Sequence, residues 1–305
     1  MLPTLRQLQY LTLLNKHGSF SRAAEAAHVT QPTLSAGIQE LEKILGSSLV
    51  DRNRSGVILT AAGAEAVVRA AAILNQAEDL VQACRGAGQP LEGRLRLGVI
   101  PTIAPFLLPA ALPVLKARYP RLRLFLREDL THRLIADLRG GVLDAVLIAL
   151  PYDTAGLEVA HVADDELLAV MAPGHALARG AAVPPDTLDR EDLILLEDGH
   201  CLRAHALAAC GLDGRRPMQE EGFAATSLAT LVQMVGSGLG VSLVPAMAVE
   251  AGMARTAQVC VRPLDPSLLR RQIVVAWRAG STRATEGRLL AEIFAAAAGP
   301  GARGA

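Results

Sequence analysis

The sequence has no excess of charge of either sign and few aromatic residues. Its 305 residues carry 30 basic and 30 acidic side chains, so the formal net charge is zero, and aromatic residues make up 3%. A neutral chain does not coat nucleic acid or an anionic membrane by bulk attraction, so any such binding must be local. Four cysteines are too few for a disulfide scaffold in a chain of this length. Side-chain packing must therefore supply the core, and 51% of the residues are hydrophobic.

No stretch of the sequence has the pattern of a membrane span or a secretory leader. Two uncharged stretches, 97–115 and 227–249, are long enough to cross a bilayer. Prolines interrupt the first, and glycines with Gln233 and Pro245 interrupt the second, so neither fits one continuous helix. The N-terminal residues lack an uninterrupted apolar segment and a cleavage site. We therefore expect a cytoplasmic protein without a membrane partner, and the length predicts about two domains.

The first part of the chain has the pattern of a helix-turn-helix. Leucines at helical spacing predict a first helix that ends at Gly18, and Ser19 or Ser21 is placed to begin an alanine-rich second helix. Thr30 is a suitable N-cap for a third helix that carries Pro32 in its first turn and ends before residue 46. In a helix-turn-helix the second of the two paired helices enters the major groove.

Two features of residues 31–59 predict contacts with DNA. The polar residues Gln31, Thr33, Ser35 and Gln39 fall on the outward face of the third helix, where amides and hydroxyls suit base edges and phosphates. Residues 49–59 predict a strand, a basic turn and a second strand. This wing would carry two arginines to the DNA backbone or minor groove. An ordinary small helical domain with a solvated polar face is the alternative.

A sequence resemblance favours the DNA-binding interpretation. The run SFSRAAEAAHVTQPTLSAGIQELEKILGSSLVDRNRSGVILTAAG resembles the winged helix-turn-helix of LysR-type transcriptional regulators. The resemblance implies double-stranded DNA as a partner, and Gln39 and Glu40 stand where basic residues often occur. The predicted DNA-binding residues are Ser21, Arg22, Thr30, Gln31, Pro32, Thr33, Ser35, Gln39, Arg52 and Arg54.

A long helix is predicted from residue 60 to about residue 89. Small and apolar residues occupy the a and d positions of three heptads, which is typical of a coiled-coil seam. The seam residues are Val67, Ala70, Leu74, Ala77, Val81 and Cys84. The resemblance implies the same dimerisation helix, and a dimer predicts an inverted-repeat operator. Cys84 fits as a small packed hydrophobe, and glycines with Pro90 mark a hinge after the helix.

Strands and helices alternate over the rest of the chain, which predicts a parallel sheet with ligands at the carboxyl ends of its strands. Strands are expected at 94–100, 121–128, 145–149, 167–171, 193–196, 241–244 and 273–277, and helices at 103–118, 131–140, 199–209, 227–237 and 282–298. The resemblance implies two α/β subdomains like those of a periplasmic binding protein.

The expected fold class is therefore α/β with an all-α-type N-terminal head. We expect a winged helix-turn-helix over 1–60, a linker helix over 61–90 and a regulatory domain over 91–305. Within the last, subdomain I would comprise 91–164 and 268–305, and subdomain II would comprise 165–267.

Four side chains are candidates for chemistry in the regulatory domain. Thr102 and Thr131 each fall where a strand gives way to a helix, so they either cap those helices or line a ligand pocket. Cys201 falls at a predicted helix N-terminus, where the helix dipole and cationic neighbours favour the thiolate that attacks peroxide. Cys210 is a second thiol that would resolve the sulfenic acid. Two buried structural cysteines are the alternative interpretation.

The spacing of Cys201 and Cys210 has a mechanical consequence. Nine residues of helix separate two Cα atoms by about 13.5 Å, whereas a disulfide needs them within about 7 Å. A disulfide between them would therefore unwind or bend the helix and change the packing of the domain.

The run EDGHCLRAHAL, with a second cysteine nine residues after the first, resembles the peroxide-sensing branch of the LysR-type family. The resemblance implies that hydrogen peroxide is the effector, that Cys201 and Cys210 form the redox-active pair, and that the protein activates antioxidant genes. The residues that it assigns to the peroxide pocket are Thr102, Thr131, His200 and Arg203.

The same resemblance implies a dimer of dimers, and a contact between Asp144 and RNA polymerase. No enzymatic turnover, cofactor or metal is expected. His205 stands where a non-basic polar residue is common, and Cys260 is expected in the core. Two alternatives stay open: a regulator that binds a small organic metabolite in the cleft, with incidental cysteines, and a catalytic thiol peroxidase.

Overall fold

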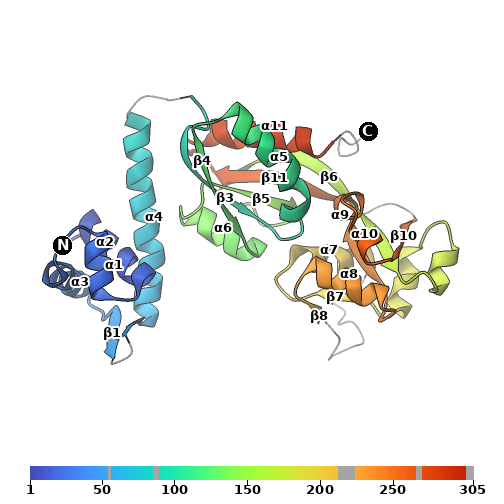
Figure 1. Ribbon diagram of the computed structural model, residues 1–305, viewed down its shortest axis with the longest axis horizontal. Coiled ribbons are helices and arrows are strands. Elements are labelled where there is room, and N and C mark those ends of the chain that lie inside the picture. The colour runs from blue at the N-terminus through green and yellow to red at the C-terminus, as the bar shows by residue number, and fades with distance from the viewer. Residues whose placement is uncertain (54–55, 85–88, 212–223, 266–269, 300–305) are drawn as a thin grey trace. The chain divides into compact units, whose positions relative to one another are not determined.

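The computed structural model describes residues 1–53, 56–84, 89–211, 224–265 and 270–299. It divides into two compact units (Figure 1): Met1–Gln89 with Asp137–Val142, and Pro90–Ala136 with Leu143–Ala305. Each unit has its own hydrophobic core, so each is described by itself.

The first unit begins with three helices and a two-stranded wing. The helices are α1 (Leu5–His17), α2 (Phe20–Ala26) and α3 (Gln31–Leu45), and the antiparallel strands are β1 (Val50–Asn53) and β2 (Gly56–Leu59). Leucines of α1 and α3 meet in the core between them. The predicted winged helix-turn-helix is confirmed, because the helices and strands lie where the sequence pattern places them.

The ends of these helices follow from local chemistry. Gly18 ends α1 and Gly46 ends α3, each with the positive φ that glycine adopts without strain. Thr30 is the N-cap of α3, and its side chain accepts a hydrogen bond from the Thr33 amide at 3.4 Å. Ser19, not Ser21, is the N-cap of α2, and it makes no side-chain capping bond.

The long helix α4 runs from Ala61 to Cys84. It is shorter than predicted: Gln89 lies in a bend, while residues 85–88, which include part of the expected hinge, fall outside the described residues. The proposed seam is also divided. Ala70 is buried in the core of the first unit and Val67 and Leu74 pack against it, whereas Val81 is exposed. The seam is therefore not free along its whole length, because its first half packs within the chain.

The second unit is built on a mixed sheet with the strand order β10-β6-β11-β5-β3-β4, and β9 pairs with β6. The strands are β3 (Gly93–Val99), β4 (Leu122–Glu128), β5 (Ala145–Leu150), β6 (Leu157–Met171), β9 (Ser242–Pro245), β10 (Cys260–Pro263) and β11 (Arg270–Arg278). β3 is parallel to β4 and β5, but β11 runs antiparallel to β5 and β6. The predicted parallel arrangement is thus confirmed for β3, β4 and β5, whereas the antiparallel strand β11 makes the sheet as a whole mixed.

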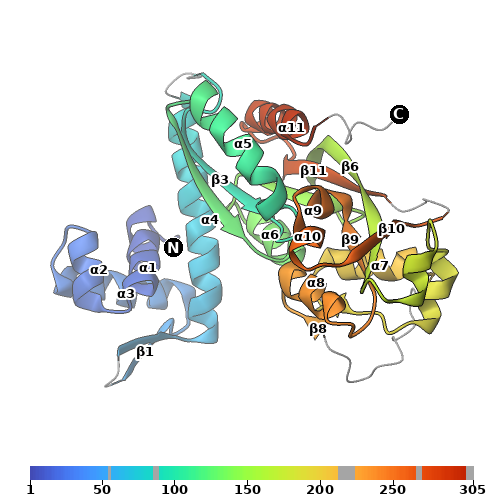
Figure 2. The same cartoon turned by 45° about the vertical axis from the view of Figure 1, so that its right-hand side comes forward.

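Strand β6 joins two groups of elements. Its first part pairs with β11, up to the pair of Glu166 with Arg270, and its last part pairs with β9 and β10. Figures 1 and 2 show helix α5 (Ala104–Arg118) beside α11 (Ala284–Ala297) on one face of the first group, and Figure 1 shows α6 (Thr131–Arg139) on the other.

The second group surrounds its own core. It contains α7 (Cys201–Ala209), α8 (Leu228–Gly236) and the short helices α9 (Ala246–Glu250) and α10 (Met253–Thr256). The short strands β7 (Leu195–Leu196) and β8 (Ala224–Ala225) pair in parallel, and two 3-10 turns span Ala176–Arg179 and Pro185–Arg190. Sequence pattern did not find α9, α10, β8 or β10, which are all five residues or shorter. Among the described residues, no helix has the length and apolar character needed to cross a bilayer.

The capping geometry predicts a stability difference between two matched variants. Replacing Thr30 with Ala removes the hydrogen bond to the α3 amide and destabilises that helix by about 1 kcal/mol. Replacing Ser19 with Ala removes no capping bond, so it serves as the control. Amide hydrogen exchange of α3 in the full chain measures the effect. Equal exchange rates in the two variants would contradict the assignment of the cap.

Candidate functional site

The two cysteines lie at opposite ends of α7. Cys201 is the first residue of the helix and is half-buried, while Cys210 is its C-cap and is buried. Both are free thiols. Leu202, Ala206 and Cys210 lie in the core of the second group and hold α7 in place. The predicted helix between the two thiols is thus confirmed, and they are kept a helix length apart.

A tight turn brings the N-terminus of α7 against α6. Gly199 has a φ of +97°, and a Cβ at this position would lie 3.0 Å from Leu130 and 3.4 Å from the His132 ring. The turn is braced by Arg203, whose Nε lies 2.9 Å from Asp198 Oδ1 and whose Nη1 donates to the Leu196 carbonyl at 3.2 Å. Arg203 therefore holds the turn that precedes Cys201.

Thr102 is buried and bonded to a buried arginine. Arg271, on β11, donates from Nη1 to Thr102 Oγ1 at 2.8 Å and from Nη2 to the Thr102 carbonyl at 2.9 Å. The same guanidinium pairs with Asp165 of β6, with Nε 2.9 Å from Oδ2. Sequence analysis missed Arg271 and Asp165. Along the chain, Thr102 is 169 residues and Asp165 is 106 residues away from Arg271, so no local pattern links them.

Thr131 is the first residue of α6 and is also buried. Its hydroxyl makes no hydrogen bond within the described part of the chain. A buried hydroxyl without a partner is costly, so one is expected to serve a ligand or a water. The Thr131 hydroxyl thus caps no amide of α6 among the described residues.

His205 lies one helical turn after Cys201, so the two side chains share a face of α7. It is 8% exposed, and neither ring nitrogen makes a hydrogen bond of normal geometry among the described residues, although the Pro151 carbonyl lies near the ring. Burial, together with the positive charge of Arg271, lowers the pKa of His205 to about 4, and the Pro151 carbonyl opposes this only in part. His205 is therefore uncharged near neutral pH, contrary to the expectation of a cationic neighbour for Cys201.

His200 and Cys210 are also shifted toward their neutral forms. Burial lowers the pKa of His200, although Glu197 and the Thr226 backbone oppose the shift. Burial, aided by the nearby carboxylate of Asp189, raises the pKa of the Cys210 thiol to about 11. Because only the thiolate is a strong nucleophile, Cys210 is protected in this conformation.

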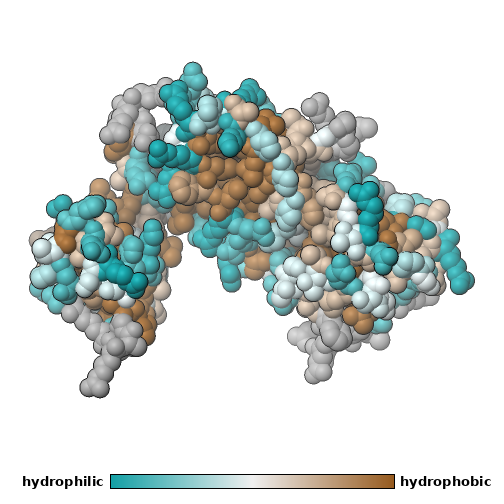
Figure 3. Space-filling view, viewed as in Figure 1, coloured by the Kyte–Doolittle hydropathy of each residue, from teal (hydrophilic) through white to brown (hydrophobic). Residues whose placement is uncertain are grey.

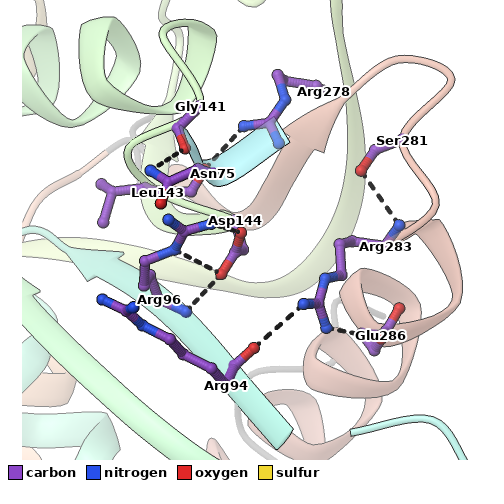
Figure 4. A network of polar contacts seen from close by, with 10 residues as sticks. All are labelled: Asn75, Arg94, Arg96, Gly141, Leu143, Asp144, Arg278, Ser281, Arg283 and Glu286. Atoms are coloured by element: carbon purple, nitrogen blue, oxygen red, sulfur yellow. Dashed lines mark hydrogen bonds and ion pairs between the residues drawn. The ribbon is translucent and has the colours of Figure 1, made fainter. Parts of the chain in front are cut away.

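The expected contact between Asp144 and RNA polymerase is not available in this structure. The Asp144 side chain is 1% exposed and pairs with Arg96, with 2.7 Å between Oδ1 and Nη2 (Figure 4). The Arg96 amide also donates to Asp144 Oδ2 at 2.7 Å. Asp144 is therefore corrected to an internal anchor of β3 and β5.

Most of the predicted DNA-binding residues are exposed in the first unit. Ser35 is half-buried, and those that are exposed are Ser21, Arg22, Thr30, Gln31, Pro32, Thr33 and Gln39. The Arg52 side chain and all of Arg54 lie outside the described residues. The described residues contain no group of three or more His, Cys, Asp or Glu that could hold a metal ion.

The two units match two family models. Residues 5–64 match the bacterial regulatory helix-turn-helix protein, lysR family, and residues 88–299 match the LysR substrate binding domain. The chain belongs to the LysR family of DNA-binding transcriptional regulators, which are not enzymes.

Within that family the chain is similar to OxyR proteins. It is 38% identical to the DNA-binding transcriptional dual regulator OxyR of Escherichia coli over 96% of this chain and 95% of that protein. In other strains that relative is called the hydrogen peroxide-inducible genes activator. It is also 44% identical to the HTH-type transcriptional regulator EstR of Acinetobacter baylyi over 83% of each chain. A full-length OxyR structure from Pseudomonas aeruginosa matches with a TM-score of 0.76 and 34% identity, over 96% of this chain and 98% of that one.

The buried neutral imidazole predicts an acid-dependent loss of stability. An unfolded histidine takes up a proton near pH 6.5, whereas His205 in the folded chain does so only near 4. As the pH falls through this window, the unfolded state gains a proton that the folded state lacks, so the free energy of unfolding decreases.

Replacing His205 with Gln should remove this part of the pH dependence. Urea unfolding at about pH 7.5 and about pH 5 measures it, since the first value lies above this window and the second lies well inside it. Replacement of the exposed His161 with Gln is the control. An unchanged pH dependence in the His205 variant would show that the imidazole is not held neutral.

Proposed function

We propose that this LysR-family regulator senses hydrogen peroxide through Cys201 and Cys210. The observation that carries the proposal is the asymmetry of the two thiols: one is half-buried at the N-terminus of α7, and the other is buried at its C-terminus. Cys201 is thus the thiol of the pair that a peroxide in solvent can reach. The names of the OxyR relatives, which refer to hydrogen peroxide, support the same effector.

The proposed reaction has two balanced steps. The Cys201 thiolate attacks one oxygen of peroxide, the O–O bond breaks, and a sulfenic acid forms while the departing hydroxide takes up a proton to become water. The Cys210 sulfur then attacks the sulfenic sulfur, and a disulfide forms as a second water leaves. Two thiols lose two electrons and the peroxide gains them. Thr102, Thr131, His200 and Arg203 are proposed to surround the reacting atoms.

The order of the two steps follows from burial. Cys210 is neutral and enclosed by the core, so peroxide reacts first with Cys201. Because nine residues of helix keep the Cα atoms about 13.5 Å apart, the second step requires α7 to bend or unwind. Oxidation would thereby change the packing of the second group.

The packing change would be transmitted to DNA through an oligomer. Exposed apolar side chains of α4, namely Val68, Ile73, Leu80 and Val81, offer a dimer contact. A second apolar patch lies over α5 and β4 (Figure 3), where Val114, Phe125 and Leu126 are exposed. Two contacts of different kinds suit a dimer of dimers on an inverted-repeat operator. We further propose that the oxidised form acts in the cytoplasm to activate antioxidant genes with RNA polymerase.

Replacing Cys201 with Ser should leave DNA binding intact and abolish the peroxide-dependent change in the DNA footprint. The reason is that serine cannot form the sulfenic acid. Replacing Cys260 with Ser is the matched control, because Cys260 is a third, half-buried thiol in the same unit, on β10. Footprinting before and after one equivalent of peroxide measures the effect.

An unchanged peroxide response in the Cys201 variant would overturn the proposal. If peroxide leaves both thiols free and a small organic anion raises the melting temperature instead, the chain senses a metabolite and its cysteines are incidental. Repeated peroxide turnover with a thiol reductant would favour a peroxidase.

A further inference from the structure

Asp165 and Arg271 form a buried ion pair at the place where β6 passes between the two groups of elements. The two residues face each other directly across the antiparallel strands β6 and β11. Their side chains are 3% and 1% exposed, and Arg271 Nη2 lies 2.8 Å from Asp165 Oδ2. Both charges are therefore removed from water.

The two oxygens of the Asp165 carboxylate accept hydrogen bonds from different partners. Oδ2 accepts from Arg271 Nε at 2.9 Å, and Oδ1 accepts from the Met247 amide at the start of α9 at 3.1 Å. The carboxylate thus fixes the guanidinium relative to the second group. The other edge of the same guanidinium holds both the hydroxyl and the carbonyl of Thr102.

A buried ion pair contributes little net stability, because desolvation offsets most of its attraction. The role of the pair here is to hold the Arg271 guanidinium in position at Thr102. Since the Thr102 hydroxyl oxygen accepts from Arg271, its own proton is left to donate elsewhere, and no acceptor for it is found in the described part of the chain. Charge on the donor strengthens such a bond and polarises the hydroxyl.

We propose that Asp165 is a positioning residue for the reaction of Cys201 with peroxide, acting through Arg271 on the Thr102 hydroxyl. This inference rests on the proposed function. Asp165 holds the guanidinium at Thr102, and Thr102 donates its proton as a hydrogen bond to a peroxide oxygen. The hydrogen bond lowers the barrier only for a reagent that leaves as hydroxide. It does nothing for an alkylating reagent, which reports only the access and nucleophilicity of the thiolate.

The neighbouring carboxylate supplies a matched control. Asp164 precedes Asp165 on β6, but its side chain is partly exposed and pairs with His161, with 2.9 Å between Oδ1 and Nε2. Replacing either aspartate with asparagine makes the same chemical change at adjacent positions. At Asp165 the amide satisfies either Arg271 or the Met247 N–H, but its NH2 group then opposes the other donor. Asp165→Asn therefore loosens the hold on Arg271.

The test compares two rates for Cys201 in the full-length reduced protein. One is the rate of thiol loss with hydrogen peroxide, and the other is the rate of alkylation by iodoacetamide. We expect Asp165→Asn to slow the peroxide reaction about ten-fold, as for the loss of one hydrogen bond to a charged group. The alkylation rate should change by less than about two-fold, and Asp164→Asn should leave both rates unchanged.

Three results would overturn the proposal. The peroxide rate of Asp165→Asn equals that of the unaltered chain, or Asp164→Asn slows it equally, or the peroxide and alkylation rates of Asp165→Asn change in parallel, as they would if the pair were only structural. If Cys201 of the unaltered chain does not react with peroxide, the proposed function fails instead. The reference rate measured on the unaltered chain shows that result directly.

A second variant keeps the proposal testable if Asp165→Asn does not fold. Thr102→Val keeps the shape of the side chain but removes the hydroxyl on which Asp165 is proposed to act. It should slow the peroxide reaction about as much and leave alkylation unchanged. Where both variants fold, the double variant should be no slower than either one, since both changes remove the same interaction. An unaltered peroxide rate in Thr102→Val would overturn the proposal.

Discussion

The proposed redox chemistry of the second unit depends on helix α7. The nine residues of α7 keep Cys201 and Cys210 at opposite ends, and a disulfide between them is incompatible with that helix. Ala206 and Leu202 pack α7 onto the core, but its N-cap residue His200 makes no side-chain capping bond. A short helix held mainly by packing is stable while its thiols are reduced. Unwinding it also costs less free energy than unfolding the whole domain.

Positive charge around α7 is not placed as the sequence pattern suggested. The candidate cationic neighbours of Cys201 are occupied or neutral: Arg203 braces the preceding turn, and His205 is kept uncharged by burial and by Arg271. The buried positive charge instead stands at Thr102, held there by Asp165.

Local signals predicted from sequence what local chemistry determines. Helix caps such as Thr30 and Gly46, the period of the leucines in α1 and the positions of β3, β4 and β5 were all found. The antiparallel direction of β11 was not predicted, because strand pairing across more than a hundred residues leaves no local mark. For the same reason the pair Arg271–Asp165 was missed, and so was the pair of Asp144 with Arg96 that buries the Asp144 side chain. The identity of the thiols was visible in the sequence, but their unequal burial required the fold.

The proposed switch depends most directly on the incompatibility of α7 with the Cys201–Cys210 disulfide. Hydrogen exchange of the α7 amides, measured by mass spectrometry before and after one equivalent of peroxide, tests it together with the peptide map of the disulfide. The account predicts that the Cys201–Cys210 disulfide forms and that the amides between the two cysteines lose their protection, while the α3 amides in the first unit keep theirs. A disulfide that forms with α7 still protected, or an oxidised chain in which both thiols remain free, would contradict it.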